Sequence, residues 1–132
     1  GEEVLALRGK TLPDEHPAVA AALIGVGRGL AGLGRFAPAE AAIRESIRLR
    51  RASLPPGHWT IASAELALGE VFFQAGRHTA AEPILVKAHD DLLAQLGAAH
   101  PRVNAARRLL HDLYQTTDRP RLAAEFSSPP AQ

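Results

Sequence analysis

The chain has 132 residues, about the length of a single domain. Hydrophobic residues make up 46% of it and the formal net charge is +1, which indicates a globular protein and argues against a nucleic-acid or membrane-surface binder. The absence of cysteine excludes a disulfide framework and a zinc ribbon. No apolar run reaches the roughly 18 residues that cross a bilayer, and the first residues lack a signal-peptide pattern, so a cytoplasmic protein is expected.

A step of 42 residues relates many positions of the chain. It is first seen in the histidines at His16, His58 and His100. The same step relates other residue types: Gly27 to Gly69, Gly34 to Gly76, Arg35 to Arg77 and Arg119, Ala39 to Ala81 and Ala123, and Leu30 to Phe72 and Tyr114. Self-similarity at one fixed offset indicates a repeat protein, in which each unit is one supersecondary element stacked on its neighbours.

The first 15 residues are predicted to end a truncated preceding repeat. Leu5 and Leu12 stand one period before Ile47 and Leu54, which belong to the second helix of the following unit. The chain also contains no methionine, even at its start. We therefore expect residues 1–15 to be the last part of a helix from an array that extends further towards the N-terminus.

The unit of residues 16–57 is predicted to be two helices, A and B, joined by a turn. Helix A is expected over about 17–33, because a proline suits the first turn of a helix, where no amide hydrogen is needed. Gly34 ends it, since glycine tolerates the left-handed conformation. Helix B is expected over about 37–53 and stops before a pair of prolines, which cannot continue a helix.

The remaining units repeat this plan. The unit 58–99 has predicted helices near 60–75 and 79–96, and the shortened unit 100–126 has predicted helices near 101–116 and 121–126. Residues 127–132, with the sequence Ser-Ser-Pro-Pro-Ala-Gln, are predicted to be a disordered tail. The sequence thus predicts an all-α solenoid of about three antiparallel helix-turn-helix repeats.

Three segments, residues 34–40, 76–85 and 96–101, resemble the tetratricopeptide repeat in its 42-residue form, known from kinesin light chains and many bacterial signalling proteins. The ending, residues 113–126, resembles the C-terminal repeat of bacterial serine/threonine kinases that carry such arrays. The resemblance implies a non-catalytic scaffold that binds a peptide or a partner protein, with no cofactor and no metal.

In this family the A helices line the concave face of the superhelix, where a partner is expected. An extended peptide held there would gain most of its affinity from apolar pockets, with charges that orient it. Carried over position by position, the partner-binding residues are expected to be Ile24, Arg28, Leu66, Glu70, Phe73, Arg108, Asp112 and Gln115. Arg28, Glu70 and Asp112 stand one period apart and predict a row of alternating charge.

Two other functions are kept as alternatives. The glycine-rich segment 25–34 contains Gly27, Gly29 and Gly32 in the spacing of a dinucleotide-binding loop, although the alanine-rich run before it is a poor strand. The truncated N-terminal flank, beside Leu5 and Leu12, predicts a homo-oligomer, because terminal repeats expose apolar surface. The repeated histidines are expected to cap helices rather than to bind metal, since metal ligands must converge within a few ångströms.

Overall fold

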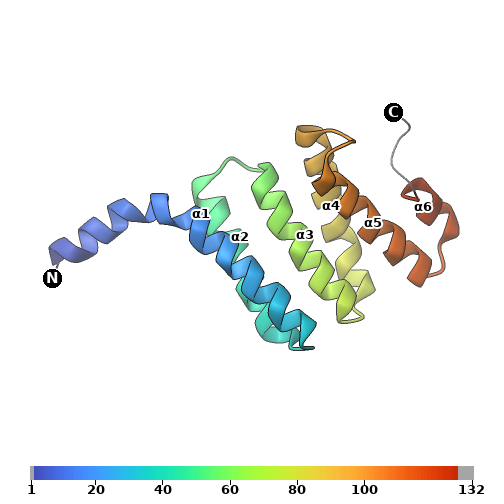
Figure 1. Cartoon of the computed structure of the whole chain (residues 1–132), viewed down its shortest axis with the longest axis horizontal. Coiled ribbons are helices and arrows are strands. Elements are labelled where there is room, and N and C mark those ends of the chain that lie inside the picture. Colours follow the sequence, from blue (N-terminus) through green and yellow to red (C-terminus); the bar gives the residue numbers. More distant parts are fainter. Residues whose placement is uncertain (1, 128–132) are drawn as a thin grey trace.

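The computed structural model describes residues 2–127, with side chains described over residues 17–127. Six helices make up this part of the chain, which contains no strand: α1 (Glu2–Gly32), α2 (Phe36–Ser53), α3 (Trp59–Gln74), α4 (His78–Leu96), α5 (Pro101–Thr116) and α6 (Pro120–Glu125). Figure 1 shows α1, α3 and α5 side by side in one layer, with α2 and α4 behind them. The fold is the predicted all-α solenoid.

Glycine sets how closely the two helices of a unit pack. A Cβ atom added at Gly27 would lie 2.8 Å from the Cδ1 atom of Ile43 and 3.1 Å from the Ala39 carbonyl oxygen. One period later, a Cβ atom at Gly69 would lie 2.6 Å from the Cδ2 atom of Leu85. The missing side chains therefore let helix B approach the backbone of helix A in both complete units.

The turns between the helices of each unit share one backbone geometry. Gly34, Gly76 and Asp118 occupy equivalent positions and have φ values of 78°, 79° and 57°. Glycine adopts this left-handed region without cost, and aspartate tolerates it better than most other residues. The turn is thus repeated in the third unit although its glycine is replaced.

Histidines cap helices, as the sequence predicts. The Nδ1 atom of His58 accepts a hydrogen bond from the Thr60 amide at 3.1 Å, and that of His100 accepts one from the Arg102 amide at 3.0 Å. These contacts satisfy amide groups that have no partner inside the helix. The side chain of His16 lies outside the described residues.

Helix α1 begins earlier than predicted. The expected start near Pro17 is wrong, because the helical backbone runs without a break from Glu2 to Gly32. A proline favours the first turn of a helix but does not require it, since a helix can continue past one missing amide hydrogen bond at some cost. The assignment of residues 1–15 to a preceding repeat stays a prediction, and the side chains of Leu5 and Leu12 lie outside the described residues, as does the predicted tail after residue 127.

An ion pair joins each unit to the next, and its arginine also lies over an aromatic ring of its own unit. Arg77 lies over the Phe72 ring, 4.6 Å from its centroid, and pairs with Glu40 of α2 at 3.5 Å. One period later, Arg119 lies 4.8 Å from the centroid of the Tyr114 ring and pairs with Glu82 of α4 at 2.6 Å. We call this arrangement of turn arginine, A-helix aromatic ring and preceding B-helix glutamate the inter-repeat clasp.

The second inter-repeat clasp, formed by Arg119, Tyr114 and Glu82, shifts the pKa values of Glu82 and Tyr114. The hydrogen bond from Arg119 is the main reason why the pKa of Glu82 is lowered, and the Tyr114 hydroxyl donates a second hydrogen bond to Glu82 at 2.9 Å. Burial, together with this bond to a carboxylate, raises the pKa of Tyr114 to about 12. The Tyr114 hydroxyl therefore keeps its proton, and with it the hydrogen bond to Glu82, well into the alkaline range.

Candidate protein-binding groove

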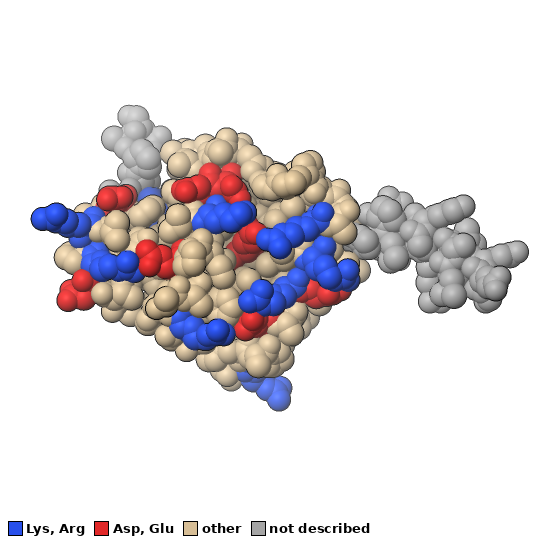
Figure 2. Space-filling model, turned by 180° about the vertical axis from the view of Figure 1, so that it is seen from behind, with Lys and Arg blue, Asp and Glu red and all other residues tan. Residues whose placement is uncertain are grey.

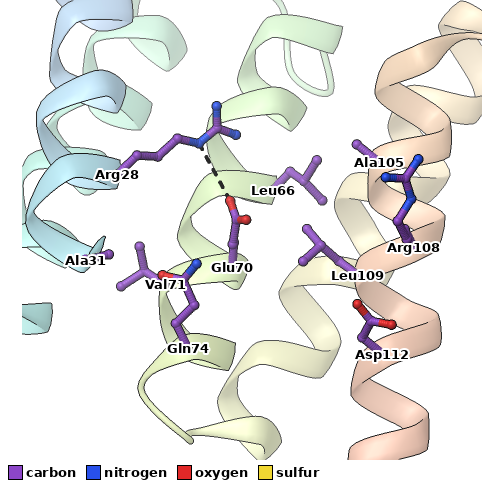
Figure 3. Close-up of a pocket in the computed structure, with 10 residues that line it drawn as sticks. All are labelled: Arg28, Ala31, Leu66, Glu70, Val71, Gln74, Ala105, Arg108, Leu109 and Asp112. Atoms are coloured by element: carbon purple, nitrogen blue, oxygen red, sulfur yellow. Dashed lines mark ion pairs between the residues drawn. The ribbon is translucent and has the colours of Figure 1, made fainter. Parts of the chain in front are cut away.

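The layer of A helices carries a groove that runs across α1, α3 and α5. Two adjoining pockets form it, with volumes of about 450 and 390 Å³, and they share Arg28, Leu66 and Ala105 in their linings. Figure 3 shows the larger pocket, into which side chains reach from all three helices. The groove thus spans both complete units and the beginning of the third.

The larger pocket combines an apolar floor with charged walls. Leu66 of α3 and Leu109 of α5 lie between the two helices and form the apolar part (Figure 3). Arg28 reaches across from α1 to Glu70, with 3.6 Å between its Nε atom and the carboxylate. This ion pair is open to solvent, since 56% of the Arg28 side chain and 30% of the Glu70 side chain are exposed. A ligand can therefore replace either partner at modest electrostatic cost.

The α5 wall of the larger pocket adds one charge of each sign. Arg108 and Asp112 lie one turn apart and both line the pocket (Figure 3). Arg28, Glu70 and Asp112 all line the pocket, but their charges run positive, negative, negative, so this row does not alternate. Asp112 is 54% exposed, with its carboxylate 3.4 Å from the Nδ1 atom of His111. The groove presents two cations and two anions over a short distance, an arrangement that suits an extended peptide with charged side chains.

The smaller pocket is basic. Arg102 donates a hydrogen bond to the Ser63 hydroxyl at 3.1 Å and lies over the Trp59 ring, 5.0 Å from its centroid. Arg50, from the last turn of α2, donates to the Thr60 carbonyl oxygen at 2.5 Å. Burial lowers the pKa of Arg50, and the charge of Arg102 lowers it further. The guanidinium groups are thus held in place by the protein before any ligand arrives.

The structure places most of the predicted residues in this groove. The five that line the larger pocket are Arg28, Leu66, Glu70, Arg108 and Asp112, and Ile24 lines the smaller one. Phe73 and Gln115 line neither. The Phe73 ring lies 5.3 Å from the ring of His78 at the start of α4 and packs against the core, and Gln115 is exposed beyond the pocket.

Helix geometry explains both misplaced residues. Each stands ten positions after a residue that lines the groove, Ser63 for Phe73 and Ala105 for Gln115. At about 100° per residue, ten positions fall about 80° short of three full turns, whereas eleven overshoot by only about 20°. Gln74 stands eleven positions after Ser63 and does line the larger pocket. An eleven-residue step would have found it from the sequence.

Val71 and Leu109 were also missed by the sequence prediction. Both line the larger pocket, and each directly follows a predicted groove residue, Glu70 or Arg108. Adjacent residues point about 100° apart on one helix, so a single-face pattern does not select both. Both lie where adjacent helices of the layer meet, Val71 buried and Leu109 partly buried, so that they line the bottom of the pocket rather than its exposed walls.

The glycine-rich alternative is contradicted by the backbone. Gly27, Gly29 and Gly32 lie inside α1 rather than in a turn after a strand. A dinucleotide-binding loop needs that turn, because its amides must point at the pyrophosphate. Over the described residues, no cluster of three His, Cys, Asp or Glu side chains is arranged to hold a metal ion, and no helix combines the length and apolar character of a membrane span.

Comparison with known proteins identifies the repeat. The family model described as the tetratricopeptide repeat matches residues 19–60, which include α2 and the C-terminal part of α1. Residues 19–60 therefore match a tetratricopeptide repeat. A comparison with curated proteins gives no match.

Solved structures show the same fold for this chain. A crystal structure of the nearly identical TPR-like repeats of a putative kinesin light chain from Podosopora anserina superposes with a TM-score of 0.76 at 19% sequence identity, covering 85% of this chain. A glutamine-to-methionine variant of those repeats gives a TM-score of 0.75 at 18% identity, again over 85% of this chain. The chain spans about half, 53%, of the length of each.

Proposed function

We propose that this tetratricopeptide repeat chain is a non-catalytic scaffold that binds a peptide or a partner protein in the groove across α1, α3 and α5. The solvent-open Arg28–Glu70 pair beside the apolar floor of Leu66 and Leu109 carries the proposal. Apolar pockets supply affinity for an extended segment, and the charges fix its direction and register. A position in a bacterial signalling protein, inferred from residues 113–126, stays a prediction.

A displayed library of random twelve-residue peptides tests this function without a known partner. Peptides selected on the wild-type chain are measured by titration against the double variant Arg28→Glu, Arg108→Glu. Both side chains line the groove and both residues are exposed, so the fold is expected to persist. We expect at least a tenfold loss of affinity, because each change reverses a charge that a bound peptide contacts.

Arg48→Glu is the matched control. Arg48 lies on α2, in the other layer of the solenoid, where 66% of its side chain is exposed and it pairs with Glu45. Figure 2 shows the face on that side, where basic and acidic side chains alternate. This variant is expected to bind the selected peptides as the wild type does. Peptides that bind the double groove variant and the wild type equally would refute the proposed groove.

A further inference from the structure

The layer of B helices carries a second large cavity, between α2 and α4. Its volume is about 520 Å³, and the residues that line it lie between positions 44 and 87, away from both ends of the described chain. Its floor is apolar, since Ile47 and Leu68 are 6% and 4% exposed and Ile84 is partly buried. We call this space, with its floor of Ile47, Leu68 and Ile84, the B-helix cleft. Figure 2 shows the face on this side of the solenoid, with basic side chains gathered near the centre of the view.

The rim of the B-helix cleft is basic. It is formed by four cations, which are Arg44, Arg48 and Arg51 of α2 and Lys87 of α4. The three arginines stand about one helical turn apart, so they follow one side of α2 along the cleft. Between 55% and 66% of each of these four side chains is exposed. Glu65 of α3 is the one acidic residue in the lining. An apolar floor beneath a basic rim favours a ligand that carries both an apolar group and a negative charge.

Glu65 fixes one cation on each wall of the cleft. It is 5% exposed, and its carboxylate binds Arg51 of α2 at 2.7 Å and Lys87 of α4 at 3.2 Å. A buried carboxylate is costly, and the repeat does not require one here, because the residues equivalent to Glu65 are Leu23 and Arg107. A single carboxylate shared in this way holds Arg51 and Lys87 close together on opposite walls before any ligand arrives.

The other ion pairs of the rim can exchange for contacts with a ligand. Each of them joins residues three or four positions apart on one helix: Arg44 to Glu40 at 2.7 Å, Arg48 to Glu45 at 2.8 Å and Lys87 to Asp91 at 2.9 Å. Exposed pairs of this kind contribute little to stability, so these cations can turn towards a bound anion at modest cost. The three carboxylates do not line the cleft, and they would repel an acidic protein segment that extends beyond it.

Comparison with the next joint of the array shows that helix stacking does not need this basic rim. The residues one period after the three arginines are Val86, Asp90 and Leu93. The residues one period after Ile47 and Ile84 are His89 and Phe126, whose rings are in contact with their centroids 5.3 Å apart. The joint between α4 and α6 is thus built without the three arginines, and their presence beside an apolar floor calls for a role other than stacking.

We propose that the B-helix cleft binds a small organic anion with an apolar body, such as an alkyl carboxylate. The apolar body lies on Ile47, Leu68 and Ile84, and the carboxylate is held between Arg51 and Lys87. The volume of the cleft falls within the range of small-molecule sites, roughly 300–1,000 Å³, which are mostly apolar with a few placed polar groups. This site is separate from the groove across α1, α3 and α5, because it opens on the other layer of the solenoid.

Octanoate is the probe. It is titrated at millimolar concentration into the isotope-labelled 132-residue chain, and amide chemical shifts are followed by NMR. We expect saturable shifts around Ile47, Leu68 and Ile84, without shifts around Leu109 in the groove of the A helices. Two ligands test the two halves of the site, since 1-octanol has the same chain length without the charge and sulfate has a charge without the apolar body. Each is expected to bind the cleft about fivefold or more weakly than octanoate, because each makes only one kind of contact.

The double variant Arg48→Gln, Lys87→Gln tests the rim. It is expected to weaken octanoate binding about fivefold or more, because two charges near the carboxylate are lost, and to leave the weaker binding of 1-octanol unchanged. The control is Arg35→Gln with Arg121→Gln, which removes the same charge at exposed positions outside the cleft.

The proposal is overturned if octanoate causes no saturable shifts at the cleft, if 1-octanol or sulfate binds there as tightly as octanoate, or if the double variant binds octanoate as the wild type does. It also fails if the double variant weakens 1-octanol and octanoate by the same factor, since the cations would then not act on the charge. If hexaglutamate shifts the residues of the cleft and octanoate does not, the occupant is an acidic protein segment and the proposal is wrong.

Discussion

Two glycines in α1 that look alike in the sequence are expected to respond in opposite ways to the same substitution. Gly27 faces α2, where an added Cβ atom would lie 2.8 Å from the Ile43 Cδ1 atom and 3.1 Å from the Ala39 carbonyl oxygen. Gly29 has nothing within 4 Å of the corresponding position. Gly27→Ala therefore requires Ile43 and the α2 backbone to move, whereas Gly29→Ala requires no movement.

The magnitudes follow from two opposing effects. Replacing glycine by alanine inside a helix stabilises it by about 1 kcal/mol, and this gain applies to both positions. Forcing a methyl group into a packed helix interface costs about 1–3 kcal/mol, and this cost applies only at Gly27. We expect Gly29→Ala to raise the free energy of unfolding by up to about 1 kcal/mol, and the two variants to differ by about 1–3 kcal/mol.

Urea denaturation followed by circular dichroism measures both variants on the same chain. Gly69→Ala is the replicate in the second unit, because an added Cβ atom there would lie 2.6 Å from Leu85. It should destabilise the chain as Gly27→Ala does. If Gly27→Ala and Gly29→Ala raise the free energy of unfolding equally, the close approach of α1 and α2 does not limit the size of residue 27, and the reasoning fails.

Three further predictions concern the helix caps and the second inter-repeat clasp. His58→Ala should cost about 1 kcal/mol of unfolding free energy, because the Thr60 amide loses its acceptor, and His58→Asn should retain most of it in the same denaturation assay. Glu82→Gln should cost about 0.5–1 kcal/mol at pH 7, since Glu82 accepts hydrogen bonds from Arg119 and Tyr114. Because the pKa of Glu82 is lowered in the fold, its contribution to stability is complete above its unfolded pKa of about 4.3 and is lost as the pH falls through the lowered value. The unfolding free energies of the wild type and the variant should therefore converge in acid. A constant difference between them down to pH 2 would contradict this. Tyr114 is the single tyrosine, so its ionisation can be followed by absorbance at 295 nm, with a midpoint expected near pH 12 in the folded chain and near pH 10 in urea. The chain should lose stability between these two pH values, because the phenol ionises first in the unfolded state. A midpoint near pH 10 in the folded chain would refute the buried clasp.

The sequence predicted the fold well because the repeat supplies many independent copies of the same signal. The turns at Gly34 and Gly76 and the cap at His58 were identified from their spacing, and the structure confirms each of them. The continuous helix before Pro17 was missed, since proline is compatible with a helix start and with a helix interior.

The groove was predicted only in part. Periodicity placed Arg28 and Glu70 on one surface, but it selects a single face of each helix, and so Leu109, which directly follows Arg108, was missed. It also cannot distinguish Gly27 from Gly29, because the difference lies in the side chain of Ile43 on another helix. Long-range packing, rather than local pattern, decides such positions.

The tight contact of α1 with α2 at Gly27, and of α3 with α4 at Gly69, has a mechanical consequence for the array. We expect each helix pair to bend little, because its backbones are too close to slide, and bending to be concentrated at the joints between successive pairs. The Arg28–Glu70 pair crosses such a joint, and its two side chains are 56% and 30% exposed. Salt screens such exposed ion pairs, so this joint should bend more easily at high ionic strength, and the pitch of the superhelix should change with it.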